Sequence, residues 1–158
     1  MEGRLEPATP DYIRERVGAT WAFPIISTTA TYAGTDGLEG LAWRYESGEI
    51  GGLVTWFIEG DWAEIVTLDA YEQGRHIGGR LLDGAEAELR SRGARRVSIT
   101  TTNDNVRAIA FYLRRGYRIV RVELDGMERV RTLKPGVPLE GNEGLPLRDM
   151  LEFEKRID

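Results

Sequence analysis

Residues 64–82 read EIVTLDAYEQGRHIGGRLL, and the rest of the chain is best understood outward from this stretch. Its first part is rich in β-branched and apolar residues, which favours a strand. From Ile77 onward, Leu81 and the leucine after it recur at helical spacing, so a helix is predicted to follow. Glycines stand at Gly74 and at positions 78–79, between the two elements. The stretch therefore predicts a strand, a glycine-bearing turn and the N-terminus of a helix.

A helix N-terminus of this kind is an anion site. Its first N–H groups lack intrahelical partners, and the helix macrodipole adds partial positive charge there. Glycines let the backbone approach a bulky anion closely, and arginines supply charge suited to phosphate. A diphosphate is therefore expected on Gln73, Gly74, Arg75, His76, Ile77, Gly78, Gly79 and Arg80. The alternative is a corner whose glycines serve only the turn.

Two other phosphate motifs do not fit. A P-loop requires Gly-x-x-x-x-Gly-Lys-Ser/Thr, and this stretch contains no Lys. A dinucleotide fingerprint requires Gly-x-Gly-x-x-Gly, and the glycine spacing here differs.

The flanking sequence predicts one α/β (α+β) domain over residues 1–158. Thr9 and Pro10 are typical of a helix start, and that helix is expected to run to about Thr20. Further helices are predicted at 77–89 and 106–113, and a loop at 131–144. Strands are predicted at 25–32, 41–46, 51–59, 62–69, 96–101, 117–124 and 148–156. The result is a mixed, mainly antiparallel sheet of about six or seven strands flanked by helices.

Composition excludes several classes of site. The chain has no Cys and a single His, which excludes disulfide scaffolds, zinc–thiolate sites and a multi-His metal site, so no metal is expected. The formal net charge of −5 argues against nucleic acid as the main partner. Residues 1–6 lack the apolar region of a signal peptide, and no stretch approaches the ~20 apolar residues of a membrane span. A cytoplasmic location fits these features.

Two segments together resemble one known superfamily. Residues 73–78 (QGRHIG) resemble the acyl-CoA pyrophosphate loop of GNAT N-acetyltransferases, usually Arg/Gln-x-x-Gly-x-Gly/Ala. Residues 105–117 (NVRAIAFYLRRGY) resemble its second motif, Asn-x-x-Ala-x-x-Phe/Tyr-Tyr-x-x-x-Gly-Phe/Tyr. The clear resemblance covers about residues 64–120. One departure is His76, which stands where the superfamily usually has the first motif glycine and tolerates positive φ less well than Gly.

The resemblance implies the GNAT fold and transfer of an acetyl group from acetyl-CoA to a primary amine by direct attack. The expected partners are acetyl-CoA, as cosubstrate, and an amine-bearing acceptor of unspecified identity; a homodimer is left open. The alternative function is a non-catalytic acyl-CoA-binding or regulatory domain with the same cleft.

The resemblance also implies residue roles. The strand before the turn is expected to splay from its neighbour, so that backbone groups of Val66, Thr67 and Leu68 bind pantetheine and the acetyl carbonyl; the alternative is a normally paired strand. Tyr112 is the expected general acid beside the CoA sulfur, or else a core aromatic. Asn105 is expected to contact the CoA arm, to cap the helix, or both.

The general base has two candidates. Glu64 shares side-chain parity with Val66 and Leu68, and relatives often use a Glu on this strand. Asp69, at the end of the strand, is the competitor. The alternative for each carboxylate is a solvent-exposed charge at the edge of the strand. A third option is that ordered water carries the proton away from the acceptor amine. Arg131 and Lys134, in the predicted loop, are expected to contact an anionic part of the acceptor.

Overall fold

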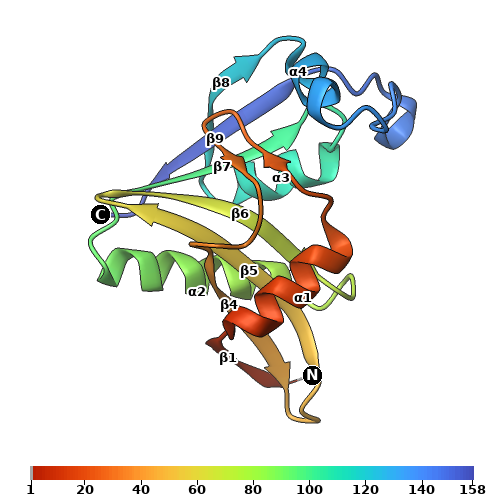
Figure 1. Ribbon diagram of the computed structural model, residues 1–158. Helices are drawn as coiled ribbons and strands as arrows, with labels where there is room; N and C mark the ends of the chain where they lie inside the picture. The colour runs from red at the N-terminus through yellow and green to blue at the C-terminus, as the bar shows by residue number, and fades with distance from the viewer. Residues whose placement is uncertain (1) are drawn as a thin grey trace.

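The computed structural model describes residues 2–158; Met1, where the predicted domain begins, lies outside them. Four α-helices and nine strands form within this range, with one short 3-10 turn, η1, at Asn142–Gly144 (Figure 1). The helices are α1 (Pro10–Thr20), α2 (Ile77–Ser91), α3 (Val106–Arg114) and α4 (Gly126–Leu133). The strands are β1 (Gly3–Pro7), β2 (Ile25–Ile26), β3 (Thr31–Tyr32), β4 (Glu39–Tyr45), β5 (Ile50–Glu59), β6 (Trp62–Ala70), β7 (Arg96–Thr102), β8 (Arg118–Glu123) and β9 (Met150–Arg156).

Seven strands form one sheet in the order β1-β4-β5-β6-β7-β9-β8. Every neighbouring pair is antiparallel except β6 and β7, which are parallel. The parallel pair needs a crossover, and α2 supplies it. The predicted mixed, mainly antiparallel sheet is thus confirmed.

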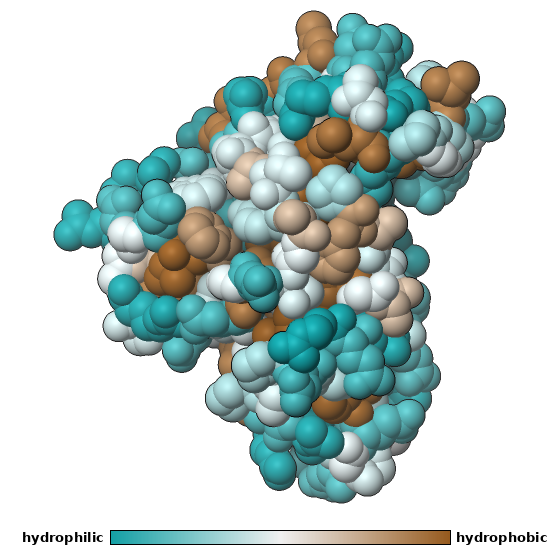
Figure 2. All heavy atoms as spheres, in the orientation of Figure 1, coloured by the Kyte–Doolittle hydropathy of each residue, from teal (hydrophilic) through white to brown (hydrophobic). Residues whose placement is uncertain are grey.

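Helices cover both faces of the sheet. On β5, Val54 packs in a cluster with α2, whereas its neighbour Leu53 packs with Ile13 and Val17 of α1. Tyr112 of α3 belongs to the same cluster as α2, so α2 and α3 share one face. Figure 1 shows α1 in front of the sheet, and Figure 2 shows apolar atoms along the middle of that face with polar atoms at its rims. We call these the α2 face and the α1 face.

Three segments differ from the sequence-based prediction. Strand β1 was not expected, because a five-residue segment with Gly and Pro has weak strand propensity; pairing with β4 forms it. The strand predicted at 25–32 is instead a small hairpin, β2–β3, because Ser27 donates its N–H to the carbonyl of Ala30 and turns the chain. Helix α4 runs into the loop predicted at 131–144, since Met127 and Val130 pack at helical spacing.

Candidate active site

Strands β6 and β7 separate halfway along their length. Their pairing runs from Trp62↔Arg96 to Ile65↔Ile99, whereas β6 continues to Ala70. Figure 1 shows the two strands diverging as a V from their shared end. Backbone groups on this edge of β6 beyond Ile65 therefore have no partner strand.

A β-bulge stands where the separation begins. Thr55 pairs with Thr67 and Trp56 pairs with Ile65, which leaves Val66 as the extra residue. Bulges bend a strand, redirect its side chains and recur beside active sites.

The bulge changes which side chains share a face. Ile65 and Leu68 both pack in the α2-face cluster, whereas Val66 packs in the α1-face cluster. The predicted parity of Glu64 with Leu68 is therefore wrong, because the extra residue shifts the alternation by one. As a result Glu64 and Asp69, five positions apart, both have hydrogen-bond partners from the α1 side of the sheet.

The turn before α2 has the left-handed backbone expected of a glycine motif. Gly74 has φ of 82° and His76 has φ of 59°. A non-glycine residue in this region costs about 1–2 kcal/mol. Helix α2 begins at Ile77, and Arg80 donates its N–H to the carbonyl of His76. The N–H groups of the first turn thus stay available for an anion.

A hollow of about 370 Å³ lies between this turn and α3. Nine of the predicted site residues line it: Leu68, Gln73, Gly74, His76, Ile77, Gly78, Gly79, Asn105 and Tyr112. Asn105 also caps α3, because its side chain accepts the N–H of Ala108. Five further residues line the hollow and were not predicted: Ala70, Glu72, Arg107, Ala108 and Phe111. Three of these lie on the first two turns of α3 after Asn105, so helical spacing from the motif Asn could have indicated them.

Four of the predicted cofactor-binding residues do not line this hollow. Arg75 pairs with Glu72 at 3.1 Å, and the guanidinium of Arg80 lies 4.9 Å from the centroid of the Trp43 ring. The side chain of Thr67 bonds that of Thr55 at 2.6 Å, and Val66 lines a cavity on the α1 face. The backbone roles proposed for residues 66–68 do not depend on these side chains and stay predictions.

Tyr112 reaches the hollow from an aromatic cluster. Its ring packs against Phe111, Tyr117 and Phe153, with centroids 5.5–6.0 Å away, and the residue is 9% exposed. Burial, together with the negative charge of Asp69, raises the pKa of the Tyr112 phenol to about 12. The phenol therefore keeps its proton through neutral pH.

Glu64 lies at the bottom of the V, on the α1 face. It is 1% exposed, and it accepts hydrogen bonds from three hydroxyls of the β2–β3 hairpin. Thr29 donates to Oε2 at 2.9 Å, while Ser27 (3.1 Å) and Tyr32 donate to Oε1. Burial raises the pKa of Glu64, and the hydroxyl donors only partly offset this. The buried carboxylate is therefore a stronger base than an exposed one.

Asp69 lies at the outer end of β6. Its Oδ2 accepts the indole N–H of Trp21 at 2.8 Å. Burial raises the pKa of Asp69, while the Trp21 bond and the charge of Arg16 oppose the rise. Both candidate carboxylates are therefore partly or fully withdrawn from water, and neither is the solvated edge charge of the alternative interpretation.

A small cavity of about 50 Å³ adjoins Glu64. Its lining comes from the end of α1, the hairpin, β6 and β7: Trp21, Ile25, Ser27, Tyr32, Glu64, Ile65, Val66 and Thr100. The hollow on the α2 face and this cavity thus meet β6 from opposite sides, next to the bulge.

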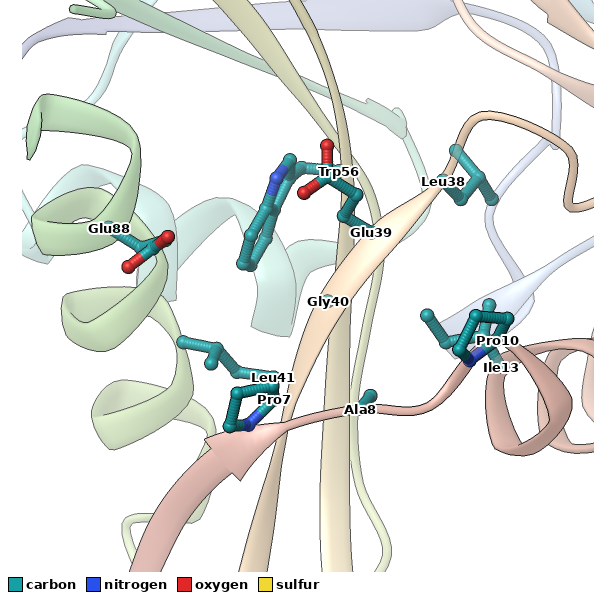
Figure 3. A pocket seen from close by; sticks show the side chains of 10 residues that line it. All are labelled: Pro7, Ala8, Pro10, Ile13, Leu38, Glu39, Gly40, Leu41, Trp56 and Glu88. Carbon is teal, nitrogen blue, oxygen red and sulfur yellow. The ribbon is translucent and has the colours of Figure 1, made fainter. Parts of the chain in front are cut away.

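Another pocket, of about 200 Å³, opens beside the edge of β4 (Figure 3). Apolar side chains such as Leu38 and Leu41 dominate its lining, and Trp56 stands between Glu88 of α2 and strand β4 (Figure 3). No residue of the two sequence motifs lines it. The hollow at the glycine turn is therefore the pocket that residues of both motifs line.

Arg131 and Lys134 do not lie free in a loop as expected. Arg131 lies in the last turn of α4 and donates to the backbone carbonyls of Val137, Pro138 and Leu147, so it ties the following loop to the helix. Lys134 donates to the carbonyl of Ala22 at 2.7 Å. Both cations are engaged by backbone oxygens, so the expectation that they bind an anionic acceptor is not supported.

Within residues 2–158 no group of three or more His, Cys, Asp or Glu side chains is arranged to hold a metal ion. In the same described range no helix is long and apolar enough to cross a membrane.

Comparison with known proteins identifies the family of the chain. The profile of the acetyltransferase (GNAT) family matches residues 10–117. The uncharacterized proteins YdhI and YxbD of Bacillus subtilis (strain 168) are 38% and 35% identical, each over 87% of this chain and 86% of their own length. Among solved structures, the IAA acetyltransferase from Bacillus cereus ATCC 14579 aligns with a TM-score of 0.77 at 17% identity, over 98% of this chain and 99% of that one. A GNAT family acetyltransferase from Elizabethkingia anophelis with acetyl-CoA bound aligns with a TM-score of 0.71 at 17% identity, over 98% and 97%. The chain belongs to the acetyltransferase (GNAT) family.

Proposed function

We propose that this acetyl-CoA-dependent acetyltransferase acylates a primary amine at the opening between β6 and β7. The observation that carries the proposal is the end of the parallel pairing at Ile65↔Ile99, with the hollow on one face and the Glu64 cavity on the other. Acetyl-CoA on the α2 face and an amine on the α1 face can meet only where the strands part.

Acetyl-CoA would enter along the α2 face. Its diphosphate lies on the turn from Gln73 to Gly79, where first-turn N–H groups and the macrodipole favour anions. Arg107 lines the same hollow and adds a cation. Pantetheine follows β6, where backbone groups of residues 66–68 hold it and polarise the acetyl carbonyl.

The reaction begins on the α1 face. The acceptor ammonium gives one proton to a carboxylate, and the neutral amine then attacks the acetyl carbonyl carbon. The C–S bond breaks as the C–N bond is retained, and Tyr112 donates its proton to the departing sulfur. The phenolate recovers a proton from the new amide nitrogen, so the net products are the acetamide, CoA thiol and one proton.

Glu64 is the better candidate for the base. It adjoins the cavity at the bottom of the V, and burial raises its pKa toward that of a proton acceptor near neutral pH. Asp69 lies at the outer end of β6 and is bonded by Trp21, which favours a role at the entrance.

The rival function is acyl-CoA binding without turnover. Release of free CoA thiol from acetyl-CoA, measured against a panel of primary amines, separates the two. Amine-dependent release supports the enzyme, and tight acetyl-CoA binding with no release for any amine supports the rival. Three statements stay predictions: the cytoplasmic location, the possible homodimer and the absence of a nucleic-acid partner.

A further inference from the structure

The acceptor side of the V carries two buried carboxylates. Glu64 is 1% exposed, and Glu152 of β9 is 9% exposed. They are close enough for the negative charge of Glu152 to contribute to the raised pKa of Glu64. Thr28 links Glu152 to the cavity wall. Its hydroxyl donates to Glu152 at 2.9 Å and lies 3.1 Å from the hydroxyl of Thr100, which lines the cavity.

Cations only partly neutralise this pair. Arg121 donates to Oε1 of Glu152 at 3.1 Å, and it is about half exposed. Arg129, which bonds the carbonyl of Ser27, is paired with Glu123. Glu64 has hydroxyl partners alone. With one guanidinium against two carboxylates, the cluster of Glu64, Glu152 and Arg121 keeps a net negative charge when both carboxylates are ionised.

The carboxylates retain acceptor capacity. Oε2 of Glu64 accepts one hydrogen bond, from Thr29, although a carboxylate oxygen can accept two. Among the described residues, Oε2 of Glu152 accepts none, since Thr28 and Arg121 both bond Oε1. A donor with several N–H groups and a positive charge would complete these bonds, and an ammonium group has both properties.

The size of the cavity limits what can enter. Its volume is about 50 Å³, and a water-sized group needs roughly 10–15 Å³ of cavity. The cavity thus admits the end of a narrow chain and excludes a ring or a branched head group. Trp21, Ile25 and Val66 line it with apolar surface that suits methylene groups.

We propose that the acceptor is a cationic primary amine on an unbranched methylene stem, without a carboxylate beside the amino group, and that Glu152 selects it. This inference rests on the proposed acetyl transfer. An α-carboxylate would bring like charge against Glu64 and Glu152 in a buried site and would also branch the stem where the cavity is narrow.

The test uses pairs of acceptors that differ by one carboxylate and have unbranched stems: agmatine and arginine, butylamine and norvaline, pentylamine and norleucine. CoA thiol release should give kcat/KM at least roughly tenfold higher for the decarboxylated member of each pair, the size of one charge interaction at this depth. Equal or better use of the amino acids overturns the inference while leaving acetyl transfer intact.

Glu152→Gln keeps the side-chain shape and removes the charge. It should raise KM for the amines roughly tenfold and reduce the difference in kcat/KM between the two members of each pair. The Kd of acetyl-CoA should stay unchanged. Glu154→Gln is the matched control, because Glu154 lies two residues along β9 and pairs with Arg96 at 3.5 Å, away from the cavity. The same KM change in both variants would refute a specific role for Glu152.

A binding measurement covers the case in which no probe is acetylated. Calorimetry of each pair on the CoA-loaded protein should show the amine binding, the amino acid binding at least roughly tenfold more weakly, and the amine signal lost in Glu152→Gln. Binding of neither member overturns the inference. Failure of acetyl-CoA itself to bind would instead overturn the proposed function.

Discussion

The two faces of β6 are lined by different kinds of chemical groups. In the proposed function the α2 face binds the cofactor through backbone groups, glycines and one phenol, and the lining of its hollow comes from residues 68–79 and 105–112. The α1 face would bind the acceptor through carboxylates and hydroxyls contributed by the hairpin, β6, β7 and β9. A cofactor can be bound by a short local motif. The acceptor site is instead assembled from distant segments, and the sequence of each segment can change independently of the others.

The largest effect is expected from Tyr112→Phe, which tests whether the α2 face serves the cofactor. If Tyr112 serves chemistry on the cofactor face, kcat should fall about 10²–10⁴-fold, the usual range for a lost general acid. The Kd of acetyl-CoA should change less than threefold, since the ring still fills its place among the aromatic cluster. Stopped-flow thiol release and calorimetry measure the two quantities.

Tyr117→Phe is its matched control. Tyr117 is also buried, but its hydroxyl donates to Glu86 at 2.8 Å rather than facing the hollow. This variant should lose roughly 1–3 kcal/mol of stability and keep its kcat. Equal kcat losses in both variants would assign Tyr112 to the core instead.

The second test concerns the acceptor face. Glu64→Gln should lower kcat/KM about 10²-fold, near the lower limit for a lost base because water can partly substitute. Wild-type kcat/KM should fall as pH decreases, because protonation removes the base, and this fall begins above the ordinary range of Glu since burial raises the pKa of Glu64. The pH profile of kcat/KM for the Glu64→Gln variant should lack this fall at low pH.

Stability gives an independent readout of the same carboxylate. A folded-state pKa above the unfolded value means that the contribution of Glu64 to stability is present at low pH and is lost as pH rises through the folded pKa. Denaturation at several pH values should therefore show Glu64→Gln gaining stability relative to wild type toward neutral pH. No pH dependence in that difference would contradict the raised pKa.

The sequence predicted the lining of the hollow on the α2 face far better than that of the cavity on the α1 face, for a physical reason. The glycine turn is a local feature that leads into α2, and helical spacing places Asn105 and Tyr112 on one side of α3. The bulge at Val66 could not be predicted, because it depends on register with β5, and it overturned the parity of Leu68. Glu152 lies 88 positions from Glu64, and only the insertion of β9 between β7 and β8 brings them together.

The third test returns to the cofactor face. A Cβ at Gly78 would have only Phe111 nearby, at 3.8 Å, so the fold should accept a side chain there. Gly78→Val should nevertheless weaken acetyl-CoA binding roughly 10–100-fold, because its methyl groups would occupy the space of the diphosphate. At Gly79 a Cβ would instead meet the guanidinium of Arg115, so Gly79→Ala should displace that flexible side chain from Asp83 and leave the backbone in place. Unchanged acetyl-CoA affinity in a folded Gly78→Val protein would move the diphosphate away from this turn.

The smallest expected effect is at His76, where the chain departs from the family motif. His76 adopts φ of 59° without a side-chain hydrogen bond to the first turn of α2. His76→Gly should relieve a backbone cost of about 1–2 kcal/mol, offset by the roughly 0.5–1 kcal/mol of extra unfolded-state entropy that Gly brings. Denaturant titration should therefore show a gain of up to about 1.5 kcal/mol in the free energy of unfolding, with the Kd of acetyl-CoA unchanged or lower. Gly74→Ala is the opposite substitution in the same turn, at φ of 82° and with open space around the new Cβ, so it should lose stability through the backbone alone. If both variants lose stability, the imidazole contributes more to the turn than its backbone strain costs, and the departure from glycine is then a stabilising feature of this chain.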